Sequence, residues 1–214
     1  MHALPFSRLL ITAGLSSMLA LLPLTATAYE SELFSLKNRW EHTMSGLPAN
    51  QREGTLKVLS DEATTLVSEN SDQPELLVWQ GIILASYARE RGGFGALGIA
   101  GDARDALEQA IALDPQGGNG SAYVTLGALY DNVPGRPISF GSSEKARQMF
   151  QRAVEIRPEG IDVNYYYAEF LLDEGDTAAA REHAERAVSG TPRAQRELSD
   201  EALRRDAQAM LNRL

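Results

Sequence analysis

The sequence contains no cysteine among its 214 residues. Disulfide bonds and cysteine-ligated metal sites are therefore excluded, and so is a lipid attached to a cysteine after an export signal. Basic residues are also scarce, since 20 Lys and Arg stand against 29 Asp and Glu, for a formal net charge of −9. Nucleic acids and anionic lipid surfaces both attract a basic face, so we expect the protein to bind neither. A cationic partner suits this charge better.

Long apolar runs are absent except near the N-terminus. There Arg8 precedes an apolar stretch over residues 9–24, and Ala26-Thr27-Ala28 has the small-x-small form of a cleavage site. These features predict a secretory signal at 1–28 that is cleaved after Ala28, which would place the protein in a bacterial periplasm. The alternative is an anchor that stays attached, but the run is shorter than the ~20 residues of a membrane-spanning helix. We expect no stable membrane span after cleavage.

A pattern of small and large apolar residues occurs three times and ends in proline each time. In the middle copy its residues are Tyr123, Leu126, Gly127, Tyr130, Ala146, Phe150, Ala153 and Pro158. In the first copy they are Leu77, Gln80, Gly81, Leu84, Ala103, Leu107, Ala110 and Pro115. In the third copy they are Asn164, Tyr167, Ala168, Leu171, Ala180, Ala184, Ala187 and Pro192. Small residues let two helices approach closely, and the proline ends the second helix because it lacks an N–H group.

This pattern resembles the tetratricopeptide repeat (TPR), a helix–turn–helix unit of about 34 residues. The resemblance implies an all-α fold, a right-handed helical solenoid of antiparallel helix pairs. Three TPR-like units would occupy residues 74–115, 120–158 and 161–192, with insertions at about 91–101 and 132–141. We interpret 29–73 as an atypical N-terminal helix pair and 193–214 as a C-terminal capping helix. The resemblance also implies a scaffold that holds a protein or peptide partner.

The resemblance further implies which residues line a concave groove, because the first helix of each TPR unit faces it. In this chain these residues are Val78, Ile82, Val124, Asp131, Asn132, Tyr165, Glu169 and Asp173. The carboxylates of Asp131, Glu169 and Asp173 suit a Lys or Arg of an extended peptide, with Tyr165 packed on its aliphatic stem. The alternative is that these acids form a solvated face without a partner.

The two insertions differ in composition. The first contains a Gly-x-Gly-x-x-Gly spacing at 93–98, but a dinucleotide site needs a strand before that loop and a helix precedes it here. We expect a flexible loop whose Phe94, Leu97 and Ile99 either contact a partner or fold back onto the helices. The second insertion holds two prolines and should be stiffer. We expect Phe140 to pack on the next unit and Arg136 to pair with an anion or with a nearby carboxylate.

Residues 132–141 and 160–167 are similar to segments of exported TPR proteins grouped with the T component of TRAP transporters. That resemblance implies association with a periplasmic solute-binding protein and self-association into a homo-oligomer. It supplies a second hypothesis, in which the chain is an accessory component of a solute transport system and binds a small apolar ligand. Members of that group that are anchored by lipid have a cysteine after the signal, which this chain lacks.

Catalytic chemistry finds little support in the sequence. After the predicted signal the only histidines are His42 and His183, on separate amphipathic segments. No serine lies in a nucleophile-elbow motif, and no cluster of His, Asp and Glu has the spacing of metal ligands. We therefore predict a protein that is not an enzyme and has no metal or cofactor.

Overall fold

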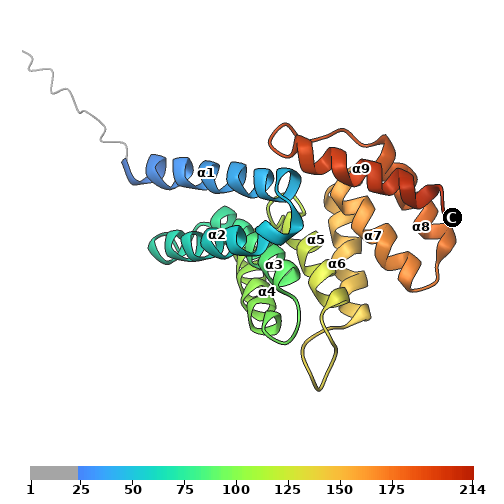
Figure 1. Cartoon of the computed structure of the whole chain (residues 1–214), viewed down its shortest axis with the longest axis horizontal. Coiled ribbons are helices and arrows are strands. Elements are labelled where there is room, and N and C mark those ends of the chain that lie inside the picture. The colour runs from blue at the N-terminus through green and yellow to red at the C-terminus, as the bar shows by residue number, and fades with distance from the viewer. Residues whose placement is uncertain (1–23) are drawn as a thin grey trace, which may run out of the picture.

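The computed structural model describes residues 24–214, with side chains from Tyr29 onward, and residues 1–23 of the predicted export signal lie outside the described part. In the described part the chain forms nine α-helices that pack in consecutive pairs (Figure 1), which confirms the all-α class. The helices are α1 (Leu24–Gly46), α2 (Ala49–Glu69), α3 (Pro74–Arg91), α4 (Ala96–Leu113), α5 (Ser121–Asn132), α6 (Ser143–Ile156), α7 (Ile161–Asp173), α8 (Thr177–Ser189) and α9 (Glu197–Leu211).

Local sequence accounts for several helix boundaries. Pro74 is the first residue of α3, where its missing N–H is harmless because that group has no partner within a helix. The Ser142 hydroxyl accepts a hydrogen bond from the Lys145 backbone N–H at 3.3 Å and thereby caps α6. Asp176 caps α8 in the same way, accepting from the Ala179 N–H at 3.1 Å. Pro74 and the two caps set points at which the chain turns back on itself.

The first predicted insertion is mostly helical, which differs from the flexible loop that we expected. α4 begins at Ala96, so the connection from α3 is the short turn 92–95, and Leu97 and Ile99 belong to the helix. Ala96, Ala100 and Ala103 are buried at helical spacing. The burial of this face outweighs the low helix propensity of the glycines in the stretch.

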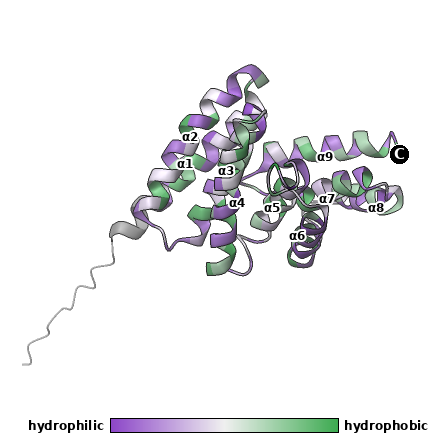
Figure 2. Ribbon diagram, turned by 90° about the horizontal axis from the view of Figure 1, so that it is seen from below, coloured by the Kyte–Doolittle hydropathy of each residue, from purple (hydrophilic) through white to green (hydrophobic). Residues whose placement is uncertain are grey.

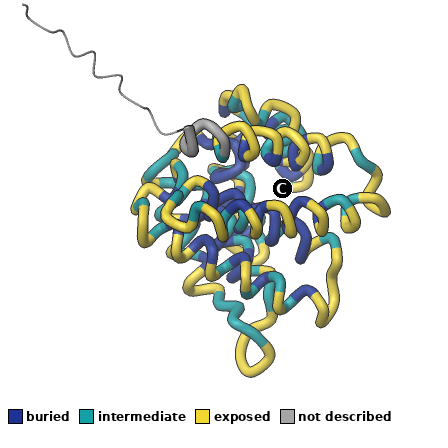
Figure 3. The backbone as a smooth tube through the Cα atoms, turned by 90° about the vertical axis from the view of Figure 1, so that its left-hand side faces the viewer, coloured by how far each residue is buried: buried dark blue, intermediate teal, exposed yellow. Residues whose placement is uncertain are grey.

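The second predicted insertion is the loop 133–142 between α5 and α6, and its base is tied to α5. The Gly141 N–H donates to the Pro134 carbonyl at 3.0 Å, and the Ser142 N–H donates to the Tyr130 carbonyl at 2.8 Å. Phe140 packs edge-on against Tyr130 of its own unit, with ring centroids 5.7 Å apart, and Arg104 of α4 lies over its ring, so the expected packing on the next unit was wrong. The tip of the loop is exposed and projects away from the helices (Figure 3).

The small residues of the repeated pattern allow the two helices of a unit to pack at very short distance. A Cβ added to Gly81 of α3 would lie 2.4 Å from Cγ of Leu107 in α4. A Cβ added to Gly127 of α5 would lie 2.7 Å from the ring of Phe150 in α6. Both glycines therefore serve a close approach between helices. Hydrophobic and hydrophilic residues alternate along the helices (Figure 2), so that each pair buries one face in a shared core.

The last helix does more than cover the final repeat unit. α9 packs on α8 and α7, as a capping helix would, and it also contacts α1. The Ser199 N–H near the start of α9 donates to Oε1 of Glu41 in α1 at 2.7 Å. The C-terminal end of α1 lies beside the start of α9 (Figure 1), so the series of helix pairs closes end to end around an internal space.

Candidate functional site

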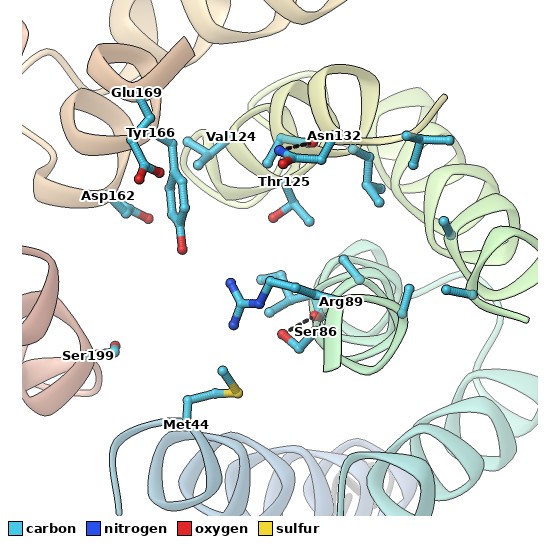
Figure 4. A pocket seen from close by; sticks show the side chains of 18 of the residues that line it. Met44, Ser86, Arg89, Val124, Thr125, Asn132, Asp162, Tyr166, Glu169 and Ser199 are labelled. Carbon is cyan, nitrogen blue, oxygen red and sulfur yellow. Dashed lines mark hydrogen bonds between the residues drawn. The ribbon is translucent and has the colours of Figure 1, made fainter. Parts of the chain in front are cut away.

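A cavity of about 900 Å³ occupies the space that this closure surrounds (Figure 4). Its wall is built by residues of α1, α2, α3, α4, α5, α7 and α9 and of the turns beside them. Because α1 and α9 come from opposite ends of the described chain, the cavity depends on the whole arrangement of helices and not on one repeat unit.

Most of the cavity wall is apolar. The residues that form this part of the wall include Trp40, Met44, Ile82, Ala85, Leu97, Ala100, Val124 and Ala128. Phe94, in the turn between α3 and α4, also lines the cavity but is 86% exposed, so it lies at the rim. The interior therefore suits an apolar group, with an aromatic side chain beside the opening.

Polar side chains project into the cavity from two opposite sides. Arg89, in the last turn of α3, extends toward the middle, and Tyr166 and Glu169 of α7 face it (Figure 4). The Arg89 side chain is 56% exposed, and its Nη2 lies 3.7 Å from Oε1 of Glu90. The Tyr165 hydroxyl donates to Oε1 of Glu169 at 2.6 Å. The cavity thus presents a guanidinium on one side and a hydrogen-bonded carboxylate on the other.

Burial affects the ionisation of the α7 side chains. It raises the pKa of Glu169, an effect that the hydrogen bond from Tyr165 opposes and that the negative charges of Asp173 and Asp206 reinforce. Burial and the hydrogen bond to Glu169 also raise the pKa of Tyr165 above its ordinary value. Tyr165 therefore remains a neutral hydroxyl donor to Glu169 at neutral pH.

The contact between the two ends of the helix array, which we call the end clasp, consists of Trp40, Glu41, Trp79, Arg196 and Ser199. Besides accepting the Ser199 N–H, Glu41 places its Oε2 at 3.8 Å from Nε of Arg196. The Arg196 guanidinium lies 4.4 Å from the ring centroid of Trp40 and 5.4 Å from that of Trp79, in cation–π geometry. Trp40 and Arg196 also line the cavity, so the end clasp forms one of its walls.

A buried network of ion pairs holds the start of α9 to the start of α7. Nη2 of Arg193 lies 2.6 Å from Oδ1 of Asp200 and 3.0 Å from Oδ2 of Asp162, whose other oxygen lies 2.7 Å from Nη2 of Arg157. Burial alone would raise the pKa of Asp162, but the charges of Arg193 and Arg157 outweigh it and lower that pKa. These carboxylates are bound to arginines of the protein itself, and their role is to hold the fold.

The sequence-predicted site residues divide into two sets. Those that line the cavity are Ile82, Val124, Asn132, Tyr165 and Glu169, together with Phe94 and Leu97. Within residues 24–214, the cavity wall does not include Val78, Asp131, Asp173, Ile99, Arg136 or Phe140. The groove positions of the repeat and the wall of the observed cavity therefore coincide only in part.

The three carboxylates that we expected to act together do not face a common cavity. In the described part of the chain, Glu169 lines the wall without Asp131 or Asp173. Burial raises the pKa of Asp131, and the charges of Asp173 and Glu174 raise it further. Val78 is 3% exposed and packs against the turn at Gly118 rather than toward a ligand.

Sequence reasoning missed the residues that close the cavity. Trp40 and Met44 of α1, Arg89 of α3, and Ser199 and Asp206 of α9 all line it. The hydrogen bond that joins α1 to α9 spans 158 positions of the chain, and no local spacing indicates such a contact. Arg89 lies seven residues, about two helical turns, after the groove position Ile82 on the same helix, so it could have been noticed as a basic residue on the groove side.

The described residues offer no arrangement for metal chemistry. No group of three or more His, Asp or Glu side chains in residues 29–214 is placed to hold a metal ion. His183 lies in α8, where its Nδ1 is 2.8 Å from Oδ1 of Asn164, and His42 lies in α1. None of the helices within residues 24–214 has both the length and the apolar character needed to cross a membrane.

The fold is similar to that of a solved TPR protein. The crystal structure of TTC0263, a thermophilic TPR protein of Thermus thermophilus, matches with a TM-score of 0.56 at 14% identity, over 86% of this chain and 93% of that chain. The crystal structure of MamA matches with a TM-score of 0.46 at 18% identity, over 76% of this chain and 89% of that one. No protein-family profile and no curated protein sequence matches significantly. The described helices therefore have a TPR-like fold.

Proposed function

We propose that this chain is a non-catalytic, exported TPR-type scaffold that binds a protein partner through a short segment inserted into the cavity. The TPR-like fold supports the proposal, because helical repeat proteins use their concave surfaces to hold other proteins. The observation that carries it is the cavity of about 900 Å³, which has apolar walls, polar groups on two sides and the exposed Phe94 at its rim.

The shape of the cavity favours a short segment over a long extended peptide. Binding pockets typically measure ~300–1,000 Å³ and combine apolar walls with a few convergent polar groups. An open TPR groove would accept a peptide along its whole length, but here the end clasp closes the groove where α1 meets α9. We therefore propose that a chain end or a single projecting turn of the partner occupies the cavity.

We further propose that the protein acts in a bacterial periplasm. The support for this location is the sequence of residues 1–28, which has the charge, the apolar stretch and the cleavage site of an export signal. A net charge of −9 favours partners whose own net charge is zero or positive.

An accessory component of a TRAP-type solute transport system is the second candidate function. The observation that favours it is the predominantly apolar wall of the cavity, which a small ligand could occupy as well as a protein segment could. In that case the protein partner would be a periplasmic solute-binding protein, and self-association would place several cavities in one assembly. The identity of the captured partner distinguishes the two functions.

A tryptophan in the cavity wall should prevent the partner from binding. Ala128 of α5 lines the cavity, and an indole there would occupy space that the inserted segment needs. We expect Ala128→Trp to reduce the amount of crosslinked partner at least about tenfold, which corresponds to about 1.4 kcal/mol of binding free energy. The measurement is formaldehyde crosslinking in cells, followed by purification and quantitative mass spectrometry of the captured proteins.

Ala178→Trp is the matched control, because Ala178 is exposed on α8, outside the helices that line the cavity. It should capture as much partner as the wild type, and circular dichroism should show both variants folded. A folded Ala128→Trp variant with undiminished capture would contradict the proposal. If the captured partner is a solute-binding protein and Ala128→Trp abolishes its capture, the transport function is favoured over the general scaffold.

A further inference from the structure

Three arginines line the cavity, and two of them are engaged by the fold itself. Nε of Arg52 donates to the Leu47 carbonyl at 2.9 Å, and Arg196 belongs to the end clasp. Arg89 differs, because its side chain is 56% exposed and its partner Glu90, at 3.7 Å, also lies 3.9 Å from Arg52. Arg89 also interacts with the Tyr166 side chain, where it opposes the rise in the pKa of Tyr166 that burial causes. The Arg89 guanidinium extends into the cavity (Figure 4), where it can meet an incoming anion.

The surroundings of Arg89 favour an anion with a single charge. Asp206 also lines the cavity, so a doubly charged group such as a phosphate would meet stronger repulsion than a carboxylate. A carboxylate also matches the planar fork of a guanidinium and accepts two parallel hydrogen bonds from it. The Tyr166 hydroxyl, which projects from α7 toward the same region (Figure 4), offers a further donor.

A cationic ligand is less well supported by the same wall. Glu169 could in principle attract a cation, but it already accepts a hydrogen bond from Tyr165 at 2.6 Å. Burial also raises the pKa of Glu169, which means that its surroundings disfavour the charged form. The guanidinium of Arg89 stands opposite and would repel a cationic group.

The apolar part of the cavity wall determines the chemistry of the rest of the ligand. Besides hydroxyl groups such as those of Ser86 and Thr125, the cavity wall contains apolar side chains, among them Met44, Ile82, Leu97 and Val124. Apolar groups placed against this wall leave water, at roughly 25 cal/mol per Å² of buried apolar surface. An occupant that satisfies both features carries a carboxylate at one end and an apolar body at the other.

We propose that the cavity binds an amphipathic monocarboxylate, with its carboxylate on Arg89 and its apolar body against the wall formed by α1, α3, α4 and α5. This inference rests on the proposed function, in which the cavity is the binding site, and it adds the chemistry of the occupant. The same chemistry occurs in a medium-chain organic acid and in the C-terminus of a peptide that ends in apolar residues. The test separates these two sources.

Binding is measured on the purified protein by titration calorimetry and by tryptophan fluorescence, which comes from Trp40 in the cavity wall and from Trp79 beside it. The first pair of probes is decanoate and decanol, and the second is an N-acetylated Gly-Ala-Val-Leu peptide with a free or an amidated C-terminus. We expect the acid of one pair to bind at least about tenfold more tightly than its uncharged counterpart, because a hydrogen bond to a charged group is stronger than one between neutral groups. The pair that shows the preference identifies the source.

Arg89→Gln should remove that preference for the acid. Arg181→Gln, an equal loss of charge at an exposed position of α8, is the matched control and should retain it. Arg89→Lys keeps the charge without the planar fork and should retain part of the preference, which gives a second variant if Arg89→Gln fails to fold.

Three results would overturn the inference: equal affinity for acid and neutral probes, an acid preference that survives in folded Arg89→Gln, or no binding of any of the four probes. These failures can be told apart from a failure of the proposed function. Partner capture that Ala128→Trp abolishes, together with no acid preference in either pair of probes, would refute the carboxylate inference while the scaffold function stands. Capture that Ala128→Trp leaves unchanged would refute the scaffold function, whereas an acid preference that Arg89→Gln removes would still support the carboxylate inference.

Discussion

Replacing Asp200 with alanine is expected to lower the free energy of unfolding by about 3–5 kcal/mol, the usual cost of removing one partner of a buried ion pair. Asp200 is 1% exposed and accepts three hydrogen bonds from Arg193, at 2.9 Å from Nε, 2.6 Å from Nη2 and 2.9 Å from the backbone N–H. The substitution would leave Arg193 with Asp162 alone and would loosen α9 from α7. Urea unfolding followed by circular dichroism measures the change.

Asp61→Ala is the matched control for this substitution. Asp61 pairs with Lys57 at 2.8 Å, one helical turn away, but its side chain is 67% exposed, and surface pairs contribute little to stability. We expect its unfolding midpoint to remain close to that of the wild type. If Asp200→Ala proved no more disruptive than Asp61→Ala, the buried network would not be what holds α9 in place.

Replacing Phe150 with alanine should also cost about 3–5 kcal/mol of stability. Phe150 is 1% exposed, and its ring centroid lies 5.6 Å from those of Tyr167 and Phe170, so it joins α6 to α7. It also covers Gly127, which has no side chain to fill the space that the ring would leave. The helices on either side cannot collapse fully into that space, and a cavity would remain. The same urea titration measures the loss.

Phe94→Ala removes the same ring from an exposed position. Phe94 is 86% exposed at the rim of the cavity, so the substitution should change the free energy of unfolding by no more than about 0.5 kcal/mol. A loss of similar size in both variants, or a loss below about 1 kcal/mol for Phe150→Ala, would contradict the assignment of Phe150 to the core between repeats.

The repeated part of the fold was predictable because its pattern is local. Gly81 and Gly127 lie where two helices touch, and their larger partners Leu107 and Phe150 lie in the second helix of the same unit. Such contacts recur at a fixed spacing, so one clear copy allows the others to be aligned. The helix pairs from α3 to α8 and the all-α class follow from this spacing.

The start of α4 was not predictable from glycine content alone. The glycines of 92–101 suggested a loop, but those at 98 and 101 have no atoms near the position of a Cβ and simply lie on the open side of the helix. Ala96, Ala100 and Ala103 form a buried stripe in the same stretch. The packing of that stripe decides the structure, and it could be recognised only once the neighbouring helix was in place.

The candidate site was predictable only in part for a related reason. Val124, Tyr165 and Glu169 were identified because the groove positions of the repeat are local to each unit. The cavity itself depends on the contact of Glu41 with Ser199, which no repeat spacing encodes. A chain that closes end to end therefore turns an expected open groove into a cavity, and it brings Arg89 into a site that the repeat pattern does not include.

The proposed function requires the partner to contact the protein at the cavity. The most direct measurement places a photo-crosslinking phenylalanine analogue in cells at Phe94, which lines the rim, or at Phe34, which is 58% exposed on α1. Both positions already carry an exposed phenylalanine, so neither change should disturb the fold. We expect the partner to form an adduct with the analogue at position 94 and not with the analogue at position 34. An adduct from Phe34 alone, or equally strong adducts from both, would contradict it.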